Sequence, residues 1–159
     1  MSRAIFALLA AVCLRAPPAS AYEGQQHVGL QGASILEDGE LNAHLSAFYT
    51  YDVSDSWRLT GSVAQTTGSF SRQGARVGVG YVIDVLRYVP WISADGGVDL
   101  WRDGSLRPIG GGAVGLDVQW SREWSTGALY RMEWMLGPSG GNPNTNAQFG
   151  LRAMYTWGK

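Results

Sequence analysis

A histidine and a serine in this chain have the spacing that a nucleophile and its base can adopt. In His44-Leu45-Ser46 they stand two residues apart, and residues two apart in a strand project from the same face. Nucleophilic catalysis also needs a third group that orients the base. Because such a pair also arises often by chance, its meaning depends on the element that carries it.

A second chemical feature is a set of charged residues that alternate with apolar ones along the chain. The set is balanced in sign and comprises Arg58, Arg76, Asp84, Asp95, Asp99, Asp117, Arg131, Glu133 and Arg152. Charges withdrawn from water must be paired. If the elements that carry these residues enclose them, the sequence predicts internal ion pairs.

The elements that position these residues are predicted to be two-faced strands. In residues 41–53 the odd-numbered residues are apolar and the even-numbered ones polar, with Phe48 the only exception. Successive strand residues point to opposite faces, so this alternation indicates a strand. The same pattern, broken by turn residues, predicts eight strands, at 26–36, 41–53, 56–67, 74–85, 90–101, 109–120, 125–136 and 147–157.

The N-terminal residues have the pattern of a secretory signal. Arg3 supplies positive charge, residues 4–14 form an apolar run too short to span a bilayer, and Ala19-Ser20-Ala21 is a cleavage site. We therefore expect residues 1–21 to be a cleaved signal peptide and residues 22–159 to be one barrel domain. Cys13 would leave with the signal, so the mature chain would contain no thiol.

The composition argues against a nucleic-acid partner. The full chain has 12 basic and 13 acidic residues, and removal of Arg3 and Arg15 leaves 10 against 13, or −3. No basic patch accompanies this balance. Charged residues make up 16% of the chain, fewer than the roughly 25–35% of an ordinary soluble surface.

The two faces of the predicted strands differ in a way that favours a membrane. The apolar face carries no charge, as expected of a face in contact with lipid. Its aromatic residues gather near strand ends, where amphipathic rings form a girdle at the headgroup level. The predicted girdle consists of Tyr49, Tyr51, Trp57, Tyr81, Trp120, Trp134, Phe149, Tyr155 and Trp157.

These observations predict an all-β fold, an eight-stranded antiparallel up-and-down transmembrane barrel. An eight-stranded barrel is just wide enough for side chains to fill, so its polar lumen should be filled by side chains. The expected hairpin registers place Arg58 opposite Asp84 and Gly61 opposite Tyr81. They also place Asp95, Gly115 and Arg131 at one level, which predicts a structural ion cluster of Arg58, Asp84, Asp95, Arg131, Glu133 and Arg152.

No cofactor or metal site is expected. His27 and His44 fall at opposite ends of the predicted barrel, and the register places His27 opposite Thr50. The glycine run 110–112 falls inside a predicted strand, where it favours close packing or a bend over phosphate binding.

Two segments carry a resemblance to a known family. The first segment resembles a strand–turn–strand of porin-like barrels. It reads Gly80-Tyr-Val-Ile-Asp-Val-Leu-Arg-Tyr-Val-Pro-Trp-Ile-Ser-Ala-Asp-Gly-Gly-Val98. The closing Phe149-Gly-Leu-Arg-Ala-Met-Tyr-Thr-Trp157 is similar to their C-terminal insertion signal, although Gly158 and Lys159 follow the final aromatic residue. The mature chain thus resembles the small eight-stranded outer-membrane barrels of the OmpA and OmpX type.

This resemblance implies a bacterial outer-membrane location, contact with outer-membrane lipid, and recognition of the C-terminal strand by the barrel-insertion machinery. The lipid A deacylases, which are also barrels, use a His-x-Ser pair with a carboxylate. Their pair lies late in the chain and faces lipid, whereas His44 and Ser46 lie early and face the lumen, and Arg58 stands where a carboxylate is needed. No catalytic residue is therefore predicted.

Four functions remain open at this level. The leading one is a structural or interaction barrel of the outer membrane with a plugged lumen. The alternatives are a small-solute channel of low conductance, a lipid-modifying enzyme of the outer membrane, and a soluble lipocalin-like barrel that binds a ligand. The last requires the apolar face to point inward.

Overall fold

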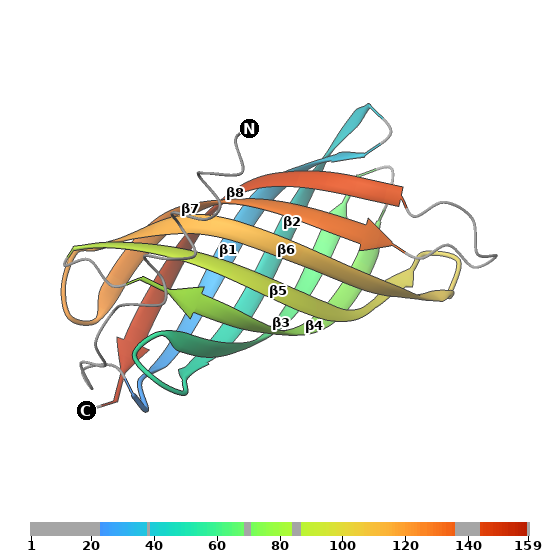
Figure 1. The fold of residues 1–159 in the computed structure, drawn as a ribbon. Helices are drawn as coiled ribbons and strands as arrows, with labels where there is room; N and C mark the ends of the chain where they lie inside the picture. The colour runs from blue at the N-terminus through green and yellow to red at the C-terminus, as the bar shows by residue number, and fades with distance from the viewer. Residues whose placement is uncertain (1–22, 38, 69–70, 84–86, 136–143, 159) are drawn as a thin grey trace, which may run out of the picture.

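The computed structural model describes residues 23–37, 39–68, 71–83, 87–135 and 144–158. They form eight antiparallel strands that close into a single barrel in the order β1 to β8, as Figure 1 shows. The strands are β1 (Gln26–Glu37), β2 (Glu40–Asp52), β3 (Trp57–Thr67), β4 (Arg72–Val82), β5 (Tyr88–Trp101), β6 (Leu106–Gln119), β7 (Trp124–Met135) and β8 (Asn144–Trp157). The predicted fold class is confirmed. The predicted signal segment and its cysteine lie outside the described residues.

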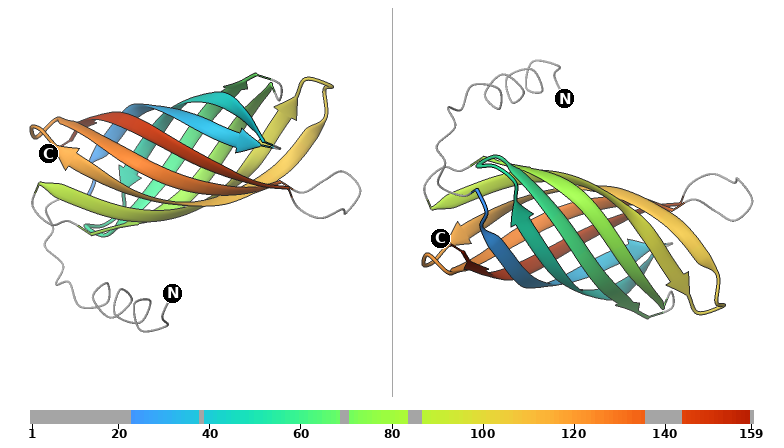
Figure 2. Two further views of the ribbon diagram at one scale, coloured as in Figure 1. Left: turned by 90° about the horizontal axis from the view of Figure 1, so that it is seen from above. Right: turned by 90° about the horizontal axis from the view of Figure 1, so that it is seen from below.

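The barrel is closed by pairing of its first and last strands. β1 pairs with β8 from Gln26 opposite Trp157 to Leu36 opposite Ala147, and with β2 on its other side. Both views in Figure 2 show the strands steeply tilted to the barrel axis. Because every strand has two neighbours, no sheet edge is left open in the part of the chain that the structure describes.

The two ends of the barrel are built differently. The end that holds Gln26 and Trp157, here called the terminal end, also holds the connections 53–56, 83–87 and 120–123. The opposite end, here called the far end, holds the connections between β1 and β2, β3 and β4, β5 and β6, and β7 and β8. At the far end Gly39 and Gly104 adopt φ values of 81° and 80°, which only glycine adopts without cost.

Two turns at the terminal end share one construction. Ser54 follows β2 and its hydroxyl accepts a hydrogen bond from the amide of Trp57 at 3.1 Å. Ser121 follows β6 in the same way and accepts from the amide of Trp124 at 3.0 Å. Serine hydroxyls that bond the backbone a few residues on are typical of tight turns. Each turn is therefore held by one side chain and starts its next strand on a tryptophan.

The outer face of the barrel is apolar on every strand. Its most exposed members include Leu41 and Val77, which are 74% and 73% exposed. None of the outward-facing strand residues that the structure describes is charged. An apolar exposed surface of this extent is not found on ordinary soluble monomers. A lipocalin-like barrel would require the uncharged apolar face of the strands to point inward, whereas here that face points outward and the charged face points inward.

Several strands start earlier than the alternation predicts. β4 begins at Arg72, β5 at Tyr88, β6 at Leu106 and β8 at Asn144, each two or three residues before its predicted start. Backbone pairing does not depend on the apolar pattern. The strands therefore continue past the last alternating residues, β4, β6 and β8 at the far end and β5 at the terminal end. In the described residues no helix is long and apolar enough to cross a membrane.

Candidate functional site

The far half of the lumen contains a buried ion network. Arg72 Nε lies 3.0 Å from Asp99 Oδ2, and Arg76 Nη2 lies 3.0 Å from Glu133 Oε1. Cross contacts from Arg72 to Glu133 and from Arg76 to Asp99 complete the network. Glu133 is fully buried and Asp99 is 1% exposed, so these charges depend on each other and not on water.

Arg131 extends this network toward the middle of the barrel. It contacts Asp95 through Nη2 and Glu133 through Nε at 2.9 Å. The register brings Asp95 and Arg131 together as predicted, but the intervening residues differ. Asp95 lies opposite Gly111, and Arg131 opposite Ala113, whereas Gly115 was the residue predicted at this level.

Gly111 provides the space that the prediction assigned to Gly115. A Cβ at Gly111 would lie 3.1 Å from Arg131 Nη2 and 2.8 Å from the carbonyl oxygen of Met132. A Cβ at Gly115 would instead meet the ring of Trp91 at 2.3 Å. Two neighbouring lumen glycines of β6 therefore accommodate two different side chains, a guanidinium and an indole.

A second ion cluster lies at the terminal end. His27 Nε2 lies 2.8 Å from Asp52 Oδ2, and its Nδ1 lies 2.8 Å from the hydroxyl of Thr156. Arg58 Nε donates to Asp52 Oδ1 at 2.6 Å. His27 stands opposite Thr50 in the register, as predicted. The cluster joins β1, β2, β3 and β8, and so it ties together both sides of the closing seam.

The predicted partner of Arg58 was wrong, because the register of β3 with β4 differs by four residues from the expected one. Arg58 lies opposite Gly80, and Trp57, not Gly61, lies opposite Tyr81. The alternation specifies which face a residue occupies, but an even-numbered shift leaves every face unchanged. Asp84 lies outside the described residues. The carboxylate that Arg58 binds, Asp52, comes from the preceding hairpin.

Arg152 forms the third inward pair. Its Nε donates to Asp117 Oδ1 at 2.8 Å, and Nη2 contacts Asp117 Oδ2. The guanidinium also lies 3.9 Å from the ring centroid of Trp91 and 5.7 Å from that of Phe48. Such cation–π contacts strengthen when they are desolvated. Arg152 is thus held by one carboxylate and two aromatic rings.

Across the described lumen, the interior ion pairs use one carboxylate for each arginine. The arginines are Arg58, Arg72, Arg76, Arg131 and Arg152, and the carboxylates are Asp52, Asp95, Asp99, Asp117 and Glu133. Of these, Arg72 and Asp52 were not predicted to form internal ion pairs, and Trp91 was not predicted as a lumen residue. Strand parity carried the signal for Asp52 and Trp91, whose outward neighbours are apolar, but not for Arg72, which stands between Ser71 and Gln73.

His44 and Ser46 occupy successive buried positions of β2. Both point into the lumen, where His44 Nδ1 lies 3.0 Å from the hydroxyl of Thr66. No hydrogen bond joins His44 to Ser46 within the described residues. The described chain also contains no group of three or more His, Cys, Asp or Glu side chains placed to hold a metal ion.

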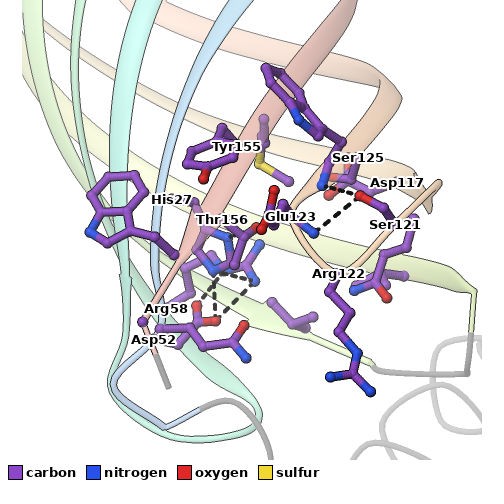
Figure 3. A pocket seen from close by; sticks show the side chains of 18 of the residues that line it. His27, Asp52, Arg58, Asp117, Ser121, Arg122, Glu123, Ser125, Tyr155 and Thr156 are labelled. Carbon is purple, nitrogen blue, oxygen red and sulfur yellow. Dashed lines mark hydrogen bonds and ion pairs between the residues drawn. The ribbon is translucent and has the colours of Figure 1, made fainter.

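The described residues line a larger and a smaller cavity in the lumen. The larger, of about 740 Å³, lies at the terminal end. Figure 3 shows Arg58, Asp52 and His27 on one wall and Ser121, Ser125 and Asp117 on the other, with Arg122 toward the outside. The smaller, of about 70 Å³, lies in the middle of the barrel, beyond Arg58 and Arg152. The far-end ion network lies past it.

Aromatic residues ring the outer surface and are concentrated at the terminal end. There Trp57 and Tyr81 stand 5.1 Å apart, as do Trp124 and Tyr155, measured between ring centroids. All nine predicted girdle residues lie on the outer face, and the girdle also includes Tyr88 and Trp124, which the sequence reading left out.

Structural comparison defines the class of fold. The chain is similar to the N-terminal β-barrel domain of Pseudomonas aeruginosa OprF, with a TM-score of 0.69 and 10% identity over 85% of this chain and 98% of that one. It is also similar to Neisserial surface protein A, with a TM-score of 0.62 and 11% identity over 82% and 95%. A designed transmembrane β-barrel matches with a TM-score of 0.64 and 16% identity over 87% and 100%.

The fold is therefore that of the eight-stranded outer-membrane barrels, as the sequence resemblance implied. No protein-family model matches the chain, and neither does any curated protein. At these identities the likeness establishes the architecture, so the role of the protein has to be argued from its own surface and lumen.

Proposed function

We propose that this protein is an integral barrel of the bacterial outer membrane, with a lumen closed by ion pairs and a structural or interaction role. The observation that carries the proposal is the uncharged apolar outer face, exposed on all eight strands and bordered by aromatic rings. In water such a surface would be strongly unfavourable, whereas in a bilayer it contacts acyl chains. Outer-membrane lipid is thus the first partner that we propose.

Fractionation of cells that express the full chain tests the location. The protein should sediment with outer membranes, resist extraction by salt or alkali, and dissolve in detergent. The folded barrel should migrate differently on a gel before and after boiling. Recovery in the soluble periplasmic fraction would contradict the proposal.

The ion pairs favour a closed lumen over a pore. Arg72, Arg76, Asp99 and Glu133 are all nearly inaccessible and connect β4 and β5 with β7 in the far half. The cavity of about 740 Å³ favours one competing function, a channel of low conductance, because it leaves the terminal end of the lumen unfilled. Planar-bilayer recording separates the two. A closed lumen predicts no stable openings, and a steady unitary conductance would favour the channel.

We further propose that β8 is the strand that the barrel-insertion machinery recognises. Its outward residues Phe149, Tyr155 and Trp157 present rings next to the closing seam with β1. Replacing Trp157 by alanine should slow assembly in cells strongly and lower the unfolding free energy of the assembled barrel only by about 1–3 kcal/mol, the loss of its ring contacts with Tyr49 and Tyr155. Ala153→Ser, on the same face of β8, serves as the control.

A further inference from the structure

Most of the polar side chains that line the small cavity in the middle of the lumen can donate hydrogen bonds. Arg58, Arg76, Arg131 and Arg152 all reach it, from four different strands, and Asp95 is its only acidic lining residue among those described. The carboxylates that pair with these arginines elsewhere, such as Asp52 and Glu133, do not line it. The lumen is neutral as a whole, but this part of it is positive.

The four arginines keep part of their donor capacity uncommitted. In the described structure their hydrogen bonds and ion pairs run through Nε and Nη2. Arg58 binds Asp52 and His27, and Arg76 binds Asp99 and Glu133. Arg131 binds Asp95 and Glu133, and Arg152 binds Asp117. The Nη1 group of each arginine takes part in none of these bonds. A guanidinium has five N–H donors and no acceptor, so these groups can be satisfied only by an acceptor.

Neutral side chains that can donate hydrogen bonds also line this cavity. Ser46, Ser62 and Ser93 line the cavity, and none of their hydroxyls hydrogen-bonds another described residue. A donor that faces a buried cavity without an acceptor is costly, and water or an anion in the cavity would relieve that cost.

The size of the cavity limits what it can hold. Its volume of about 70 Å³ exceeds the roughly 10–15 Å³ that a single water needs, but it is too small for an organic molecule of more than a few heavy atoms. Hydrogen bonds from charged donors to an anion are about twice as strong as neutral ones. Several guanidinium groups around one small space are therefore better matched by a negative charge than by water alone.

We propose that this cavity, lined by Arg58, Arg76, Arg131, Arg152 and the three serines, binds one small inorganic anion, a halide or inorganic phosphate. The bound anion would accept from the uncommitted Nη1 and hydroxyl groups and would connect the far-end network with the terminal-end cluster. This site is independent of the proposed plugging, because the far-end network closes the lumen whether or not the cavity is occupied.

Anion titration of the purified, folded barrel tests the site. In neutral detergent, with gluconate keeping the ionic strength constant, bromide and phosphate are added in separate series and the unfolding midpoint is followed. A ligand that binds only the folded state raises that midpoint. We expect a saturating rise with at least one of the two anions, and the series that responds identifies the anion. No saturating rise with either would overturn the proposal.

A cavity-filling variant provides the specific control. Ala113 lines the cavity and is 5% exposed, so Ala113→Val takes up space there without removing a charge. It should abolish the anion dependence, whereas Ala64→Val, on the lumen face of β3 outside the cavity lining, should retain it. An equal response in Ala113→Val and in the unaltered protein would contradict the site.

Two further measurements keep the test decisive if Ala113→Val does not fold. Ser62→Ala removes one donor and leaves the cavity open, so it should raise the half-saturating anion concentration severalfold. If bromide is the anion that responds, crystals soaked in bromide should show an anomalous peak between Arg131 and Ser62. If phosphate responds, crystals soaked in phosphate should show tetrahedral density there. A cavity that shows neither would argue for water alone. Bilayer conductance, measured separately, reports on the plug and not on this site.

Discussion

Glu133 is the residue on which most of the internal charge converges. Arg72, Arg76 and Arg131 all contact it, and it has no exposed surface. Three positive groups around one carboxylate are tolerated because Asp99 and Asp95 each supply a further negative charge nearby. The arrangement makes each member of the network dependent on the others, which is the usual behaviour of buried ion pairs.

Removal of this one charge should therefore be costly. Glu133→Gln leaves three arginines with two carboxylates and should lower the free energy of unfolding by about 3–5 kcal/mol, the usual cost of breaking a buried pair. Urea-induced unfolding in lipid vesicles measures it. Asp103→Asn is the matched control, because its ion pair with Arg107 is exposed at the far end, and we expect little change. Equal effects of both changes would show that the network does not stabilise the barrel.

Neighbouring glycines in β5 show how closely the strand backbones and side chains are packed. A Cβ at Gly97 would lie 2.0 Å from the carbonyl oxygen of Ala75 and 2.9 Å from the Cα of Arg76. A Cβ at Gly96, on the outer face, would lie 3.7 Å from the nearest heavy atom. The first position therefore requires glycine and the second does not.

Gly97 and Gly96 are therefore expected to respond differently to replacement by alanine. Gly97→Ala should destabilise the barrel by about 1–3 kcal/mol, as overpacking does, because backbone atoms must move. Gly96→Ala should be neutral or slightly stabilising, since alanine restricts the unfolded chain more than glycine does. Unfolding free energies of the two variants under the same conditions decide it, and a more harmful Gly96→Ala would contradict the register.

The hairpin between β5 and β6 allows a prediction about pH. Hydrogen bonds from the Ser105 hydroxyl at 2.6 Å and the Ser105 amide at 2.8 Å, together with Arg107, hold the pKa of the Asp103 carboxyl below its usual value. The stabilisation that Asp103 contributes is thus present above the usual aspartate pKa and is lost as the pH falls through the lowered pKa.

Carboxyl-resonance titration by NMR measures this pKa directly. Asp103 should titrate below an ordinary exposed aspartate, and Ser105→Ala should move its midpoint upward by removing the shortest hydrogen bond. An ordinary midpoint in the unaltered protein would show that the hairpin hydrogen bonds are not formed in solution.

The limits of sequence reasoning are clearest at the level of strand pairing. The alternation in residues 41–53 predicted the strand and its inward face, because a period of two is set by backbone geometry. The partner of Arg58 was not predictable in the same way, because pairing it with Asp84 or with Asp52 gives the same alternation. Trp91 was missed for a related reason, since a tryptophan on the polar face makes sense only once Arg152 is known to lie against it.

At the scale of the whole molecule, the outer face should tolerate charge only near its borders. Val77 is 73% exposed in the interior of β4, and Gln73 lies near the start of the same strand on the same face. Val77→Arg should lower the unfolding free energy in lipid by about 2–4 kcal/mol, and Gln73→Arg by about 0–1 kcal/mol. The comparison is made in vesicles. Equal costs at both positions would argue against a bilayer around the barrel.

The concentration of aromatic pairs at the terminal end has a consequence for how the barrel adapts to bilayers of different thickness. Rings anchor a protein at the interface that they occupy, and most ring contacts, including Trp57–Tyr81 and Trp124–Tyr155, lie at one rim. The two ends of the barrel then respond differently to a mismatch between the apolar surface and the bilayer thickness. The terminal end keeps its depth in the membrane. When the membrane becomes thinner or thicker, the far-end hairpins change their depth, and there Gln65 and Gln73 already interrupt the apolar surface.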